Sequence, residues 1–162
     1  MNETPTLNPR HLRRRLDAAA SQFDTADFVH TVTRDGLHAR LKPLLLTAES
    51  VLDLGSATGA AHNGLKTRFP RAHHVAFDIS RNMLAEDRRK RSWRARLPFS
   101  RSTFVQGDAS KLPFKTNSFD VVFSNLLLPY VDQPDSVFAE VARVLREDGV
   151  FAFATLGPDS LR

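Results

Sequence analysis

The sequence predicts an α/β fold in which a doubly wound, mostly parallel sheet carries helices on both faces. From residue 51 onward, short apolar runs alternate with helix-like segments, and right-handed crossovers join strands in such a pattern. The chain has 162 residues, of which 41% are hydrophobic, so one domain can bury most of its apolar surface. Ligands bind beyond the carboxyl ends of the strands in sheets of this kind.

The segment before the first strand is expected to be helical over residues 10–47. Apolar residues recur there on two helical spacings: Leu12, Leu16, Ala19 and Phe23, then Phe28, Val32, Leu37 and Leu41. We therefore divide the chain into an N-terminal helical segment, residues 1–47, and a core, residues 48–162.

Five apolar runs are predicted to be strands. They are "VLDL" (51–54), "HHVAFDIS" (73–80), "STFVQGDA" (102–109), "FDVVFSNLLL" (119–128) and "GVFAFATL" (149–156). The fourth run is continuous, which is typical of a strand buried on both faces. Helices are expected over 58–70, over 80–93 with Ser80 as N-cap, and from Pro134 to just before Gly149.

Composition excludes several classes of protein. There is no cysteine, so no disulfide framework, thiolate nucleophile or thiolate metal site is expected. No apolar run approaches the roughly 18 residues that a membrane span needs, and the first residues lack the apolar core of a secretory signal. We expect a cytoplasmic protein with no membrane span, although the N-terminal arginines leave an organellar presequence as an alternative.

The formal net charge of +5 is concentrated in two segments, "RHLRRRL" (10–16) and "RRKRSWRAR" (88–96). A solvated helix face is the simpler interpretation. An acidic partner is the alternative, either a nucleic acid, an anionic surface or an acidic carrier protein. Nucleic acid is the less favoured partner, because no nucleic-acid module signature is present.

Polar residues follow the first four predicted strands. They are Asp53, Gly55 and Gly59 after the first, Asp78 after the second, Asp108 after the third, and Ser124 and Asn125 after the fourth. Three carboxylates on one rim repel one another unless water or a ligand with several donors lies between them. The sequence therefore predicts a ligand site at this rim.

The glycine spacing narrows the chemistry of this ligand. The pattern D-x-G-x-A-x-G differs from the dinucleotide fingerprint G-x-G-x-x-G, and the predicted rim has no obvious cation for phosphate. Asp78 follows Gly59 by 19 residues, the interval at which an acidic residue binds ribose hydroxyls in nucleotide sites. A nucleoside with few phosphates fits best.

At these residues the chain resembles the class I S-adenosylmethionine-dependent methyltransferases, which have a Rossmann-like fold. Four segments carry the resemblance in the family's order: "VLDLGSATG", "FDIS" followed by Met83 and Leu84, "GDASKLPF" and "FDVVFSNLLLPY". The flanking segments "FDTADFVH" and "FATLGPDSLR" are similar to the malonyl-acyl-carrier-protein O-methyltransferase group of biotin synthesis. The relatives of that group include an arginine-hydroxylating assembly factor.

The resemblance implies that S-adenosyl-L-methionine is the cofactor and gives a role to each matching residue. Asp53, Gly55, Ala57 and Gly59 would form the loop under its methionine part, and Asp78 would hold the ribose, with Ile79 and Met83 near the adenine. Asp108 would accept from the adenine amino group beside Ala109, and Asn125 and Leu126 would border the sulfonium. Core packing is the alternative for Ile79 and Met83, and a turn or cap for Asp108.

The chain departs from the family at three places. Ala57 stands where glycine is usual, Ser56 stands where cysteine is common, and the chain stops where the family's sheet continues with further strands. We therefore expect the fifth strand to be an open edge, at which a homodimer could form.

Methyl transfer depends chiefly on alignment, so no catalytic acid or base is expected. The candidates for lining an acceptor pocket are His30, Arg34 and Tyr130, each with a structural alternative. The favoured function is O-methylation of a carboxylate such as malonyl-acyl carrier protein. The alternatives are a cofactor-binding module or assembly factor without transferase activity, and a ubiquinone-pathway or other small-molecule methyltransferase.

Overall fold

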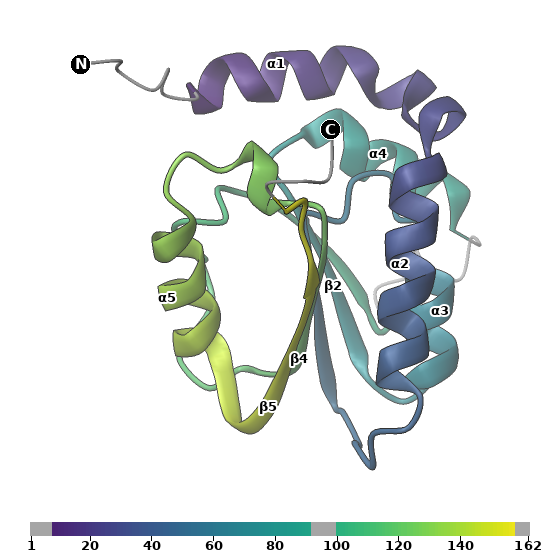
Figure 1. Cartoon of the computed structure of the whole chain (residues 1–162), viewed down its shortest axis with the longest axis vertical. Coiled ribbons are helices and arrows are strands. Elements are labelled where there is room, and N and C mark those ends of the chain that lie inside the picture. The colour runs from purple at the N-terminus through teal and green to yellow at the C-terminus, as the bar shows by residue number, and fades with distance from the viewer. Residues whose placement is uncertain (1–7, 92–99, 158–162) are drawn as a thin grey trace.

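A five-stranded parallel sheet forms the centre of the molecule (Figure 1). The computed structural model describes residues 8–91 and 100–157. The strand order is β3-β2-β1-β4-β5 and every neighbouring pair is parallel. The strands are β1 (Ser50–Leu54), β2 (His73–Asp78), β3 (Ser102–Gln106), β4 (Phe119–Asn125) and β5 (Leu145–Ala154). The predicted doubly wound sheet is confirmed, and its order reverses between β1 and β4.

Two α-helices and a 3₁₀ turn precede the sheet. They are α1 (Pro9–Ala19), η1 (Ala20–Ala26) and α2 (Phe28–Leu41). Asn8 begins α1, because its side chain accepts a hydrogen bond from the backbone N of Arg10 at 2.9 Å. The expectation of helix as far as residue 47 is wrong, since α2 ends at Leu41. Pro43 explains this end, because proline cannot donate to the preceding turn of a helix.

The remaining helices connect the strands. They are α3 (His62–Arg68), α4 (Arg81–Lys90), the short η3 (Leu128–Tyr130) and α5 (Pro134–Val144). Ser80 is the N-cap of α4, as predicted, and its Oγ accepts from the backbone N of Met83 at 3.1 Å. The predicted continuation of this helix to residue 93 is wrong, since α4 ends at Lys90 and the backbone of Arg91 is extended.

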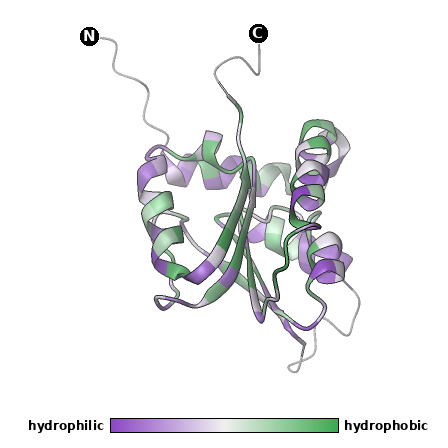
Figure 2. Ribbon diagram, turned by 60° about the horizontal axis from the view of Figure 1, so that its bottom comes forward, coloured by the Kyte–Doolittle hydropathy of each residue, from purple (hydrophilic) through white to green (hydrophobic). Residues whose placement is uncertain are grey.

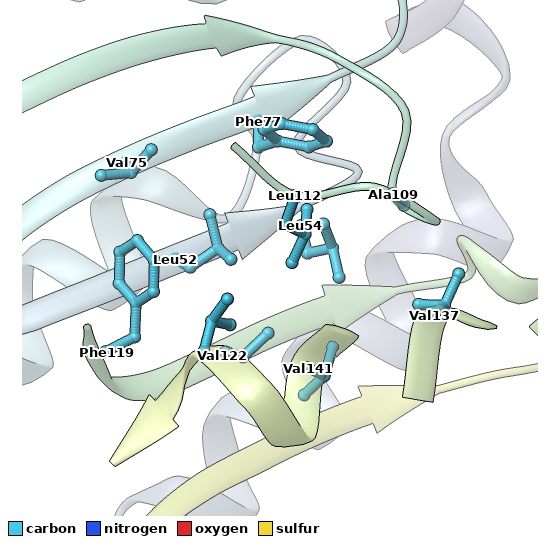
Figure 3. Close-up of a cluster of buried hydrophobic side chains, with 11 residues drawn as sticks. Leu52, Leu54, Val75, Phe77, Ala109, Leu112, Phe119, Val122, Val137 and Val141 are labelled. Atoms are coloured by element: carbon cyan, nitrogen blue, oxygen red, sulfur yellow. The ribbon is translucent and has the colours of Figure 1, made fainter. Parts of the chain in front are cut away.

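Two apolar layers hold the helices against the sheet. Leu52 and Leu54 point to the face that α5 covers through Val137 and Val141 (Figure 3). On the opposite face Val51 packs with residues of α2 and α3. The hydrophobic colour of Figure 2 is accordingly concentrated on the strands, whereas the outer helices show both colours. Because β4 lies between the two layers, its predicted burial on both faces is confirmed.

The last helix and strand differ from the prediction. The helix ends at Val144, five residues before Gly149, and β5 begins immediately at Leu145. The ladder with β4 contains an irregularity, because Phe119 pairs with Leu145 but Val121 pairs with Val150. The extra residues form a bend that includes Asp148, whose φ is 63°. Helical periodicity alone did not reveal that this segment pairs with β4.

Substitution of Leu52 tests whether this residue lies in the core of the protein. Its side chain is fully buried, so Leu52→Ala is expected to lower the free energy of unfolding by about 2 to 5 kcal/mol. Leu45→Ala is the matched control, because Leu45 is fully exposed. Urea denaturation of both variants would measure the difference. Equal losses would contradict this description of the core.

Candidate functional site

A pocket of about 280 Å³ lies at the carboxyl ends of the strands. It sits where the strand order reverses between β1 and β4, the position at which sheets of this type bind ligands. Helix α1 crosses above this end of the sheet (Figure 1), and Pro9, Leu12 and Leu16 line the pocket from it. The described lining includes Asp78, Asp108 and Asp132 but neither lysine nor arginine.

Asp78, at the end of β2, connects two neighbouring segments. One carboxylate oxygen accepts from the backbone N of Ser80 at 2.8 Å, and the other accepts from the backbone N of Ala57 at 2.9 Å. Burial raises the pKa of Asp78, and these backbone hydrogen bonds oppose the rise because they favour the carboxylate. Each oxygen keeps a second lone pair with which it can accept from a ligand in the pocket.

The loop after β1 forms another wall of the pocket with its backbone. The backbone N atoms of Gly55 and Ser56 donate to the carbonyl oxygen of Phe77 at 2.8 and 3.0 Å. Gly55 has φ +75°, and a Cβ there would lie 3.1 Å from the side chain of Leu127. Ala57 follows with φ 45°, in a region that costs a non-glycine residue about 1 to 2 kcal/mol. Both Gly55 and Ala57 line the pocket.

Asp108 lines the pocket together with Ala109. One of its carboxylate oxygens accepts from the backbone N of Ser110 at 2.9 Å and from the Ser110 hydroxyl at 2.8 Å. These bonds form an Asx turn. Asp108 therefore forms a turn and lines the pocket at the same time. Ile79 and Met83 also line the pocket, although Met83 is almost fully buried and packs in the interior as well.

Asn125 and His30 connect β4 to helix α2. The side-chain amide of Asn125 donates to the carbonyl oxygen of His30 at 2.9 Å. Its Oδ1 atom is buried and has no hydrogen-bond partner within the described parts of the chain. Both residues line the pocket, as does Tyr130. Arg34 is not among the lining residues, and its guanidinium pairs with the carboxylate of Asp27 at 3.0 Å.

Asp53 and Gly59 do not line this pocket, in contrast to the other predicted cofactor-binding residues. Side chains alternate along a strand, and since Leu52 and Leu54 face α5, Asp53 faces the opposite layer. There it borders a second cavity of about 10 Å³, together with His62, His74 and Arg91. The three carboxylates therefore do not meet around one ligand, and only Asp78 and Asp108 share the larger pocket.

A buried ion pair lies beside the second cavity and supports the glycine loop. The Arg91 guanidinium donates to both carboxylate oxygens of Asp87, each at 2.6 Å. A Cβ on Gly59 would collide with this carboxylate, so only glycine allows the loop to approach it. Of the predicted basic segment 88–96, Arg91 is thus buried and paired, and residues 92–96 lie outside the described residues.

The N-terminal segment is attached to the site through residues that the sequence analysis missed. The hydroxyl of Ser80 donates to Asp17 of α1 at 2.6 Å. The hydroxyl of Thr58 donates to Asp24 at 2.5 Å, and Lys90 donates to the same carboxylate. These contacts join residues more than 30 positions apart, and no local pattern marks either aspartate.

Neither a metal-binding cluster nor a membrane-spanning helix occurs in the described residues. No group of three or more histidine, cysteine or acidic side chains there could hold a metal ion. No helix in the described ranges is long and apolar enough to cross a membrane.

The family of the chain follows from comparison with known proteins. A family of methyltransferase domains matches residues 52–153, from β1 through most of β5. The chain belongs to this methyltransferase domain family. The match contains both the glycine loop and the strand ends that form the large pocket.

Curated relatives of this chain share one name. A malonyl-[acyl-carrier protein] O-methyltransferase of Laribacter hongkongensis is 36% identical over 165 residues, which cover 100% of this chain and 56% of the relative. One from a Methylovorus species is 34% identical, over 96% of this chain and 53% of that protein. The chain therefore spans about half the length of the curated relatives it matches.

Solved structures support the same fold. A chain from the complex between the Haloferax volcanii Trm112 methyltransferase activator and a methyltransferase is 26% identical, with a TM-score of 0.71 over 86% of this chain and 59% of that one. A Haemonchus contortus phosphoethanolamine N-methyltransferase, solved with S-adenosylhomocysteine, is also 26% identical, with a TM-score of 0.61 over 73% of this chain and 26% of that one. Family and relatives support S-adenosylmethionine as the cofactor.

Asp53 makes a testable contribution to the pH dependence of stability. Burial raises its pKa to about 7, far above the value of about 3.9 in an unfolded chain. The folded state therefore binds the proton more tightly, and the stability that protonated Asp53 contributes is lost as pH rises from about 4 to 7. Burial lowers the pKa of His62 to about 3 and of His74 to about 4. Both histidines are therefore mostly neutral in the folded state above about pH 5, whereas the unfolded chain still binds protons at them up to about pH 6.5, so they make stability rise with pH.

Because the histidines contribute equally to both proteins, we expect the melting temperature of the wild type to fall relative to that of Asp53→Asn, which keeps the shape but cannot ionise, as pH rises from about 5 to 7.5. Thermal melts of both proteins across this range would measure the two slopes. Equal slopes would contradict the assignment to Asp53.

Substitution of Ala57 tests whether the positive φ at this position strains the loop. Ala57→Gly removes the cost of a positive φ but adds flexibility to the unfolded chain, so we expect a net gain in stability of up to about 1 kcal/mol. Ala60→Gly is the control, because Ala60 is exposed and is not among the positive-φ residues, and a small loss is expected there. Urea denaturation would measure the free energy of unfolding of both variants. A lower value than that of the wild type in both would show that Ala57 is unstrained.

Proposed function

We propose that this protein is an S-adenosylmethionine-dependent methyltransferase that O-methylates a carboxylate, and that its acceptor is malonyl-acyl carrier protein in biotin synthesis. Membership of the methyltransferase domain family supports the transfer. The names of the relatives that match nearly the whole chain support the acceptor. A cytoplasmic location and a homodimer formed along the edge of β5 are further parts of the proposal.

The observation that carries the proposal is the charge of the large pocket. Its described lining contains three aspartates and no lysine or arginine, so it repels phosphate groups and attracts a cation. S-adenosylmethionine carries a sulfonium, an ammonium group and a ribose with two hydroxyl donors, which suit carboxylate acceptors. The apolar residues between the aspartates provide contacts for a flat adenine ring.

Each pocket residue has a role in this proposal. Gly55 and Ala57 let the loop backbone approach the methionine part of the cofactor, and the carboxylate of Asp78 accepts from the ribose hydroxyls. Ile79 and Met83 contact the adenine. Asp108 and Ala109 lie at its amino group, and Asn125 lies beside the sulfonium. Asp53 and Gly59 act indirectly, since they lie behind the loop.

The cofactor supplies an electrophilic methyl group, and the protein aligns the acceptor with it. A malonyl carboxylate is already ionised at neutral pH, so the chain need not provide a base. Asn125, His30 and Tyr130 border the pocket on the side of β4 and η3, where they can orient the acceptor. Positioning of this kind can account for most of the rate of an in-line displacement.

Two measurements test the proposed function. Calorimetric titration with S-adenosylmethionine and S-adenosylhomocysteine tests the pocket, and transfer of a labelled methyl group to malonyl-acyl carrier protein tests the reaction. Absence of binding would overturn the proposal. Binding without transfer would instead favour a cofactor-binding module.

Asp78→Asn tests the proposed ribose contact. A charge-assisted hydrogen bond contributes about 1.5 to 3 kcal/mol, so we expect about ten- to a hundredfold weaker binding of S-adenosylhomocysteine. Asp120→Asn is the matched control, because Asp120 also accepts backbone hydrogen bonds, from Glu49 and Ser50, but near the amino-terminal end of β1. We expect the control to lose stability and keep its affinity. Similar affinities in both variants would rule out the ribose role of Asp78.

A further inference from the structure

Helix α1 has two chemically different faces. Leu12 and Leu16, one turn apart, point into the large pocket. Arg10, Arg13 and Arg14 lie on the rest of the helix and are exposed, as is Arg15. The same eleven-residue helix therefore forms one wall of the pocket and presents a cluster of cations to solvent.

These four arginines differ from most other cations near the site. No ion pair involves them within the described parts of the chain, whereas Arg89 pairs with Glu86, Lys90 with Asp24, and Arg91 with Asp87. On α4 only Arg81 and Arg88 form no ion pair among the described residues. Helix α1 thus carries the larger group of exposed arginines without an ion pair in the described parts of the chain, and we call the surface formed by Arg10, Arg13, Arg14 and Arg15 the α1 basic face.

Helix α1 is held firmly enough to serve as a docking platform. Asp17 accepts from the Ser80 hydroxyl at 2.6 Å, and the Asn82 side chain donates to the Asp17 carbonyl oxygen at 3.1 Å. Ser80 is also the N-cap of α4 and a hydrogen-bond partner of Asp78. The helix is therefore attached to the same short segment that shapes the pocket.

The rim of the pocket is electrically asymmetric. Outside α1, Asp132 lines the pocket and Asp135 lies in the first turn of α5, and both are exposed. An acidic partner is attracted to α1 and repelled by this acidic side. Such an arrangement determines orientation as well as encounter rate.

We propose that the α1 basic face is the docking surface for the acyl carrier protein that presents the substrate. Acyl carrier proteins are acidic, which matches the charge of this face, and a partner seated on α1 lies directly beside the pocket. The proposal rests on the proposed function for the identity of the carrier. It places the docking site at residues 10–15, within the first of the two basic segments of the sequence.

The test measures binding and does not require turnover. Fluorescence anisotropy with labelled malonyl-acyl carrier protein would be recorded for the whole chain and for Arg13→Glu/Arg14→Glu. At an ionic strength of about 0.01 M, where the Debye length is about 30 Å, we expect the double variant to bind the carrier about tenfold more weakly or worse. At about 1 M salt, where that length is about 3 Å, the difference should largely disappear.

Lys42→Glu/Arg71→Glu is the matched control, because it makes the same change in net charge at exposed residues near the other end of the sheet. We expect less than about a twofold change there. Equal weakening in both double variants would show a general charge effect and overturn the docking site. Tighter binding of a single-stranded RNA than of the carrier would overturn the choice of partner.

S-adenosylhomocysteine affinity is measured in the same variants, because α1 also lines the pocket. Unchanged cofactor affinity with weakened carrier binding supports the proposal, and unchanged carrier binding overturns it. If both affinities fall, the variant Arg13→Gln/Arg14→Gln distinguishes the two explanations, because it removes the positive charges without adding acidic ones. A carrier affinity equal to that of the wild type would overturn the docking site. A carrier affinity between those of the wild type and the Glu variant would support it. Failure of the wild-type protein to bind S-adenosylhomocysteine would refute the proposed function separately.

Discussion

The pocket depends on the attachment of the loop after β1 to the end of β2. Two consecutive backbone N atoms of the loop, at Gly55 and Ser56, donate to one carbonyl oxygen, that of Phe77, and the next donates to the carboxylate of Asp78. These bonds hold the backbone against the neighbouring strand with positive φ values at Gly55, Ala57 and Gly59. Without these hydrogen bonds nothing would offset the strain of the positive φ values. The loop would then relax, and one wall of the pocket would be lost.

The loop is supported from behind by charged groups that do not touch the large pocket. The Asp87 carboxylate lies where a side chain on residue 59 would be, and Arg91 neutralises it with two hydrogen bonds. A buried pair of this kind adds little net stability, but removal of one partner leaves an uncompensated charge. Asp53 faces the same region, and the repulsion from Asp87 adds to the effect of burial on its pKa.

The N-terminal segment is part of the same assembly. Through Asp17 and Asp24 it contacts Thr58 of the loop after β1, and Ser80 and Lys90 at the two ends of α4. The family match begins only at residue 52. The helices before it therefore add a wall to a pocket whose other walls belong to the methyltransferase domain, and this wall carries four exposed arginines on its outer side.

The sequence by itself determined the alternation of strands and helices, the cap at Ser80 and the strand ends that carry Asp78, Asp108 and Asn125. These are local properties, because side-chain period, turn residues and caps depend on near neighbours. The direction of Asp53 could also have been predicted from its place between Leu52 and Leu54. The end of α5 at Val144 could not, since pairing of the following residues with β4 outweighed helical periodicity.

Only the tertiary structure decided which of these residues meet. It placed Asp78 and Asp108 in one pocket and turned Asp53 toward another, buried Arg91 against Asp87, and laid α1 over the strand ends. The physical reason is that each of these contacts joins segments whose separation and orientation are set by how the helices pack on the sheet. No pattern within a single segment contains that information.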